Sequence, residues 1–268
     1  MAEAERPTEL ASNTAVALAG RIVATLALLV VALLFAQMLL ADAAALPRAA
    51  GLGLCAFLTF AVAVTGLLCL GANRIHPASC AALGLVILAV RVAGSAATLD
   101  DPVAMVDSAM TLLAAYFLGS ALAAWLSRTQ WTRAVLATAA AALLVFHVLP
   151  QSARAVRAGA FAASTFSVVI PLEAREAWRF EPSGAPCPGL HLVDFALLAA
   201  VILLALHGTI GRKAVAAGVV VAAVAVGVLT AVSESPVPAL PWVVATVLAA
   251  RAFSPPAAAE SREPAQAG

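Results

Sequence analysis

The most obvious shortage in this sequence is charge. Only 11% of the 268 residues are Asp, Glu, Lys or Arg, whereas 63% are hydrophobic. A water-soluble domain needs a charged surface, so this balance excludes a soluble fold over the whole chain. The formal net charge is +1, and the chain therefore lacks the basic excess that is typical of proteins that bind nucleic acid.

Metal-type cysteine spacing and a signal peptide are also missing. The four cysteines, at positions 55, 69, 80 and 187, do not form the close pairs of a zinc site, so we predict neither a metal nor a cofactor. The segment MAEAERPTEL contains three glutamates and lacks the short basic start of a cleaved signal peptide. We therefore expect the first apolar run, residues 22–40, to remain in the protein as a helix.

Long apolar runs are what the sequence does contain. In hydrocarbon every backbone N–H and C=O must be paired internally, which allows only helices or closed barrels, and these continuous Ala/Val/Leu runs favour helices. We predict an all-α integral membrane protein, a bundle of about eight transmembrane helices in contact with the lipid bilayer. The predicted helices are 20–41, 49–71, 79–99, 103–126, 132–149, 189–207, 213–233 and 237–253.

The distribution of Lys and Arg predicts the orientation of these helices in a bacterial inner membrane, because cytoplasmic segments are enriched in both. With both termini inside, the acids expected in the outer segments are Asp42, Asp100, Asp101, Glu173, Glu176, Glu181 and Glu234. The cations expected inside are Arg6, Arg21, Arg74, Arg128, Arg133, Arg212, Lys213, Arg251 and Arg262. This predicts cytoplasmic tails at 1–19 and 254–268, the second of them disordered, with membrane segments at 20–149 and 189–253.

Residues 150–188 form the one long extramembrane segment that we predict, and we place it outside. Its apolar part, about 158–172, is short for a membrane span, so we expect an interfacial or membrane-inserted piece followed by an extended stretch. Tryptophans tend to gather at membrane interfaces. We therefore expect Trp178 and Trp242 at the outer interface, and Trp125 and Trp131 at the inner one.

Cys187 is the candidate nucleophile. It precedes Pro188, and proline favours the first position of a helix, so Cys187 would be the N-cap of the sixth helix. The partial positive charge at a helix N-terminus favours the thiolate. His191 and Asp194 follow at helical spacing, and His147 at the end of the fifth helix is a second candidate base. The alternatives are a solvent-exposed cysteine without a role, or a disulfide with Cys55.

Arg91 and Asp107 are candidate intramembrane charges near the outer ends of the third and fourth helices. A short outer loop makes these helices antiparallel neighbours, so the two side chains can pair. Arg91 is equally able to extend outward to Asp100 or Asp101. We assign Arg91 a candidate catalytic role, and Asp107, Arg154 and Asp194 candidate substrate-binding roles.

The four histidines leave a minor alternative open. His147 and His191 are expected at the outer side, and His76 and His207 at the inner side. Two levels of imidazoles in a membrane bundle are also found in proteins that carry two b-type haems.

From about residue 166 to 234 the chain resembles the exosortase/archaeosortase family of membrane cysteine transpeptidases. The resemblance lies in the stretch FSVVIPLEAREAWRFEPSGAP, the motif Cys187-Pro188-Gly189-Leu190 at the start of a helix, and the basic turn LHGTIGRK before the next helix. It implies eight helices, an outward-facing cysteine, and action on the C-terminal sorting signals of exported proteins.

The sequence departs from that family at two functional positions. The family has an arginine near the outer end of the helix after the cysteine helix, where this chain has Leu229-Thr230-Ala231-Val232-Ser233. No histidine follows His207, so the family's later histidine is missing too. If the relationship holds, Arg91 or Arg154 would stabilise the oxyanion and His147 or His191 would act as base. An inactive relative fits the same residues.

Two classes of function follow from the sequence. The first is an exosortase-like cysteine protease or transpeptidase, in which the Cys187 thiolate attacks a scissile amide. The second is a non-enzymatic membrane protein, such as a transporter subunit or an accessory of an envelope or exopolysaccharide system. In that case Arg91 and Asp107 are structural or line a solute path.

Overall fold

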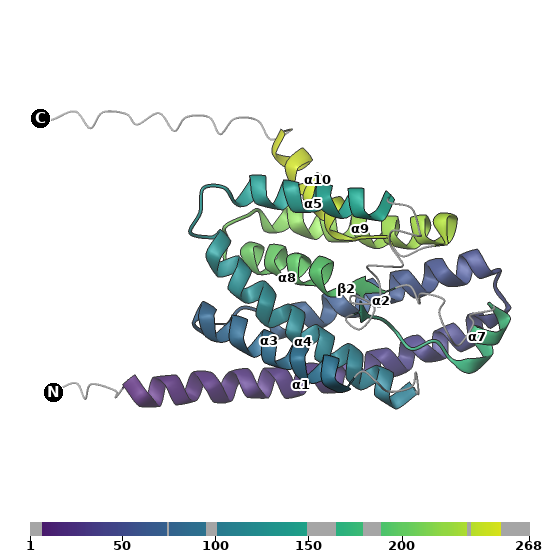
Figure 1. The fold of residues 1–268 in the computed structure, drawn as a ribbon, viewed down its shortest axis with the longest axis horizontal. Coiled ribbons are helices and arrows are strands. Elements are labelled where there is room, and N and C mark those ends of the chain that lie inside the picture. The colour runs from purple at the N-terminus through teal and green to yellow at the C-terminus, as the bar shows by residue number, and fades with distance from the viewer. Residues whose placement is uncertain are drawn as a thin grey trace, which may run out of the picture.

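The computed structural model describes residues 7–73, 75–94, 101–148, 165–178, 189–234 and 237–252. Cys187 and Arg154 lie outside these ranges, and His147 is described by its backbone alone. Within the described residues the fold is a bundle of apolar helices with one two-stranded sheet (Figure 1). The prediction of an all-α protein is confirmed.

Eight of the described helices are apolar and have 13 residues or more. They are α1 (Pro7–Asp42), α2 (Arg48–Leu70), α3 (Pro77–Gly94), α4 (Asp101–Leu126), α5 (Thr132–Val148), α8 (Leu192–Leu206), α9 (Arg212–Ser233) and α10 (Leu240–Ala252). The smaller elements are η1 (Ala43–Ala45), β1 (Thr165–Phe166), α7 (Leu172–Ala177) and β2 (Leu190–His191). Segments of α1, α2, α4 and α9 are long and apolar enough to cross a membrane, whereas α3, α5, α8 and α10 have shorter apolar stretches.

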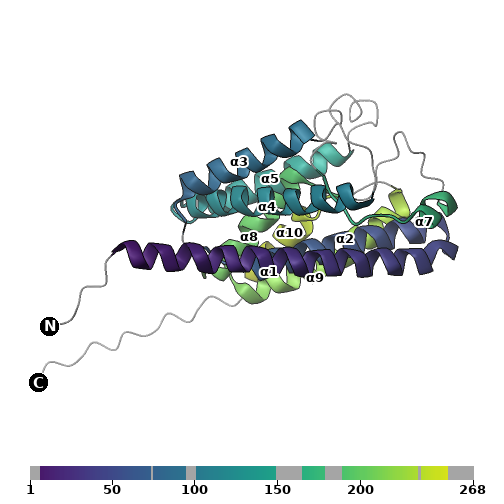
Figure 2. The ribbon, with the colours of Figure 1, turned by 90° about the horizontal axis from the view of Figure 1, so that it is seen from below.

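The chain runs back and forth between two ends of the bundle. We call the end where α1 begins, and where the turns after α2, α4 and α8 lie, the proximal end (Figure 1). The opposite end, where α1 meets α2 beside α7, is the distal end (Figure 2).

The surface of the bundle is apolar, as a bilayer requires. Many large hydrophobic side chains of α1, α3 and α9 point outward, among them Val31, Phe35, Val86 and Val224. Water would penalise such a surface, whereas lipid chains solvate it. Together with the helix lengths, this surface identifies a membrane protein.

Small residues allow the helices to approach closely. A Cβ on Gly53 of α2 would lie 2.7 Å from the carbonyl oxygen of Gly227 in α9, and one on Gly119 of α4 would lie 2.6 Å from Ala199 Cβ in α8. Helix contacts in membranes favour small residues for this reason. At Gly119, α4 therefore packs directly on α8.

Two helices differ from their predicted bounds. Helix α1 begins at Pro7 instead of residue 20, because proline suits a first helical turn and no strong helix breaker follows before the membrane run. Helix α8 begins at Leu192, not at residue 189, because Leu190–His191 pairs with β1 instead of continuing the helix.

The two tryptophans that we predicted at the outer interface, Trp178 and Trp242, have a different exposure from the one expected. Trp178 is buried inside the protein instead of lying at a lipid interface, and its Nε1 donates a hydrogen bond to the Leu46 carbonyl oxygen (3.2 Å). Its ring fills a slot over Gly51, where a Cβ would lie 2.2 Å from the indole. Trp242 is partly buried, whereas Trp125 and Trp131 are exposed at the proximal end, as an interfacial belt requires.

Candidate functional site

The site is built around a non-helical segment that enters the bundle. Residues 165–171 are extended, and Phe166, Val168 and Ile170 are almost completely buried. The prediction of an interfacial piece is therefore wrong for residues 165–171. The extended stretch was expected after them, but Leu172–Ala177 forms the short helix α7, and residues 179–188 lie outside the described residues. Non-helical backbone is tolerated within a membrane bundle where the surrounding protein covers it, as it does here.

Three contacts from different helices hold this segment. The Val168 backbone N–H donates to Thr59 Oγ1 of α2 (3.2 Å), and Ser108 Oγ of α4 donates to the Ser167 carbonyl oxygen (2.7 Å). The Phe166 ring lies against Phe195 of α8, with 5.3 Å between centroids. These contacts satisfy backbone groups that burial would otherwise leave unpaired.

The first two residues of the segment form a short antiparallel sheet with the residues that precede α8. Thr165 pairs with His191, and Phe166 pairs with Leu190. The sheet lies about midway along the bundle, and α8 starts from it (Figure 1). Thr165–Phe166 and Leu190–His191 thus meet at one point inside the protein.

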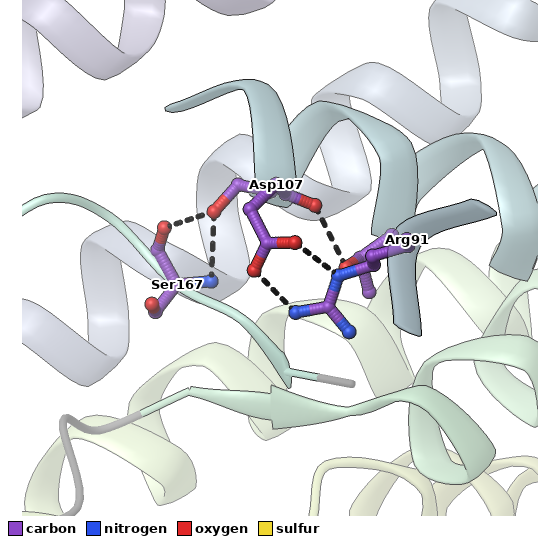
Figure 3. Close-up of polar contacts among 5 residues, drawn as sticks. Arg91, Asp107 and Ser167 are labelled. Atoms are coloured by element: carbon purple, nitrogen blue, oxygen red, sulfur yellow. Dashed lines mark hydrogen bonds and ion pairs between the residues drawn. The ribbon is translucent and has the colours of Figure 1, made fainter. Parts of the chain in front are cut away.

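Arg91 and Asp107 form a bidentate ion pair beside this segment (Figure 3). Arg91 Nε donates to Asp107 Oδ1, and Arg91 Nη2 donates to Asp107 Oδ2. The Arg91 side chain is 3% exposed and that of Asp107 is 34% exposed. The sequence left this pairing open beside a contact to Asp100 or Asp101. The observed pair neutralises a buried guanidinium, and Ser108, the next residue, binds Ser167.

Asp194, a predicted substrate-binding residue, binds groups of the protein itself. It is buried in the first turn of α8, and its carboxylate accepts hydrogen bonds from the backbone N–H groups of Ala239 (2.8 Å) and Leu240 (3.0 Å). These N–H groups belong to the start of α10 and have no partner within their own helix. Asp194 therefore caps α10 across the bundle, and its own helix begins only at Leu192.

His191 is the N-cap residue of α8, without a capping side-chain hydrogen bond. Its side chain is exposed. A neutral imidazole is the form of histidine that can accept a proton. The predicted N-cap role of Cys187 is wrong, because Cys187 precedes this N-cap by four residues.

A small cavity lies next to the sheet. It measures about 10 Å³ and is lined by Thr59, Gly189, Leu190 and Thr230, among others. Thr230 is 1% exposed, and its Oγ1 has no hydrogen-bond partner among the described residues. A space of this size holds about one water molecule and excludes a peptide.

Sequence reasoning missed the polar groups that hold the site and the proximal turn. Thr59 and Ser108 stand among apolar residues in helices, where a hydroxyl is usually bonded to its own helix. At the proximal end, Asn73 donates to Tyr116 Oη (2.8 Å) and to Ser120 Oγ (3.0 Å). Tyr116 is the only tyrosine of the chain, and that rarity was the one available signal.

Comparisons with protein-family models, with curated proteins and with solved structures gave no match to this chain. The functional argument therefore depends on the residues and their geometry alone.

Proposed function

We propose that this protein is an exosortase-like cysteine enzyme of the bacterial inner membrane, with eight membrane-spanning helices and both termini in the cytoplasm. The observation that carries the proposal is the pairing of β1 with β2 midway along the bundle. It anchors the chain four residues after Cys187, and His191 lies at that anchor.

The proposed chemistry is acyl transfer through the thiol. The imidazole of His191, or that of His147, accepts the thiol proton, and the Cys187 thiolate attacks the amide carbon of an exported protein's C-terminal sorting signal. The amide C–N bond breaks, the proton passes to the leaving amine, and a thioester remains on Cys187. An amine or water then attacks the thioester and releases the thiol.

In this arrangement Arg91 is not placed to donate to an oxyanion, because its guanidinium already makes two hydrogen bonds to the Asp107 carboxylate. Arg154 remains a candidate both for oxyanion stabilisation and for substrate binding, and it lies outside the described residues. Asp107 and Asp194 both bind groups of the protein itself, so a substrate would have to displace these contacts.

The reactivity of the Cys187 thiol tests the proposal. In a variant in which Cys55, Cys69 and Cys80 are replaced by alanine, we measure the rate of alkylation as a function of pH. An activated thiol reacts with a midpoint at least about one unit below the value near 8.5 of free cysteine. His191→Gln should move the midpoint upward.

A matched control is Ser233→Cys in a background without Cys187, because Ser233 is an exposed residue at the distal end of α9. The control thiol should titrate as an ordinary cysteine. If Cys187 titrates like this control, the thiol is not activated and the enzyme proposal fails.

The second candidate is a non-enzymatic membrane protein, such as an accessory of an envelope or exopolysaccharide system. Two observations favour it: the cavity beside the sheet measures only about 10 Å³, and the carboxylates of Asp107 and Asp194 already bind groups of the protein itself. Under this alternative, alkylation of Cys187 leaves every property of the protein unchanged.

A further inference from the structure

A much larger pocket lies at the proximal end of the bundle. It has a volume of about 530 Å³ and lies between the first turns of α5 and α9 and the second half of α10. Its inner wall is apolar and includes Leu136, Val201, Val244 and Val247. The volume falls within the range of roughly 300–1,000 Å³ that is typical of pockets for small ligands.

Two cations line this otherwise apolar pocket. Arg133 is in the first turn of α5 and Lys213 is in the first turn of α9. Both residues are exposed, and among the described residues neither has a hydrogen bond or an ion pair. An anion at this position would therefore displace no internal partner.

The surrounding chain adds positive charge and no negative charge. The sequence has no Asp or Glu in residues 126–136, 206–218 or 243–252, which form or flank the pocket. Helix α9 also begins here, and its N-cap residue Gly211 offers no side chain to bind the first backbone N–H groups. These N–H groups strengthen the positive potential at the same point.

We propose that this pocket binds an anionic phospholipid from the leaflet at the proximal end. The phosphate lies between Arg133 and Lys213, and an acyl chain lies along the wall formed by Val201, Val244 and Val247. Basic pockets between membrane helices bind such headgroups. The apolar wall selects a lipid over a free anion, and the two cations select an anionic lipid over a neutral one.

Native mass spectrometry of the full-length protein in a neutral detergent tests the proposal. The protein is titrated with phosphatidylglycerol, with phosphatidylcholine and with inorganic phosphate. Phosphatidylglycerol should bind, and Arg133→Gln combined with Lys213→Gln should weaken it by about thirty-fold, as expected for two cations at a membrane surface. Arg128→Gln is the matched control, because Arg128 is an exposed cation of the same proximal turn that does not line the pocket.

A second variant tests the apolar wall without a change in charge. Ala214→Leu narrows the pocket from α9 and should weaken phosphatidylglycerol binding, while the protein keeps its thermal unfolding temperature. Equal binding of phosphatidylcholine, or an unchanged affinity in the double variant, would overturn the proposal. Competition by inorganic phosphate as strong as that by the lipid would show a simple anion site instead. None of these outcomes depends on Cys187.

Discussion

At the scale of single residues, the two partners of the Arg91–Asp107 ion pair differ in their exposure to solvent. Arg91 is nearly inaccessible, whereas Asp107 keeps about a third of its side chain exposed. Loss of the carboxylate leaves a buried guanidinium unpaired, but loss of the guanidinium leaves a carboxylate that polar surroundings can still reach. The two single substitutions are therefore not equivalent.

We expect Asp107→Leu to destabilise the protein more than Arg91→Met does. Breaking a buried pair from one side costs about 3–5 kcal/mol, and replacing both partners by apolar residues is often close to neutral. Thermal unfolding in detergent of Arg91→Met, Asp107→Leu and the double variant gives the coupling free energy between the two side chains. The double variant should be more stable than Asp107→Leu alone.

Additive losses in that cycle would mean that the two side chains do not depend on each other. A stable double variant that has lost activity would restore a catalytic role for Arg91, because its effect would then be independent of folding.

At the scale of elements, Asp194 links two helices that are far apart in the sequence. Its carboxylate binds the first N–H groups of α10 from the first turn of α8, 45 residues away. Helix α10 has 13 residues and depends on packing and capping more than a longer helix does. Asp194 is therefore expected to control the position of α10.

Asp194→Ala should destabilise the protein more than Asp194→Asn does. The alanine leaves two buried N–H groups unpaired, at about 1–3 kcal/mol each, whereas asparagine retains one acceptor oxygen. Hydrogen exchange measured by mass spectrometry should show faster exchange at residues 239–243. Glu173→Ala, an exposed acid in α7, is the control and should change neither quantity.

If Asp194→Ala folds with normal exchange in α10 but loses ligand binding, the capping role is wrong. The substrate-binding role predicted from the sequence would then be correct.

At the scale of the whole molecule, the apolar runs were enough to predict the helices. The short connection between α3 and α4 was enough to predict that these two helices pack against each other. The sequence could not predict the burial of residues 165–171, because their extended backbone depends on Thr59, Ser108 and the partner strand β2. The same pairing sets the start of α8, which local helix signals place several residues too early. Trp178 was misplaced because Gly51 creates its slot from a distant helix.

The predicted orientation also concerns the whole molecule. In the described residues, the turns after α4 and α8 lie at the proximal end, together with the exposed cations Arg128 and Lys213. If α1–α5 and α8–α10 all cross the bilayer, both tails and these turns share one side, and the distribution of Lys and Arg predicts that this side faces the cytoplasm.

The most direct test of this account is the sidedness of single cysteines in a cysteine-free background, probed in intact cells with a membrane-impermeant maleimide. Ala45→Cys and Ser233→Cys, at the distal end, should react in intact cells. Ser127→Cys and Thr209→Cys, at the proximal end, should react only after the membrane is permeabilised. Reaction of Thr209→Cys in intact cells, or the same response at both ends of α9, would contradict the membrane arrangement and leave Cys187 without an outward-facing site.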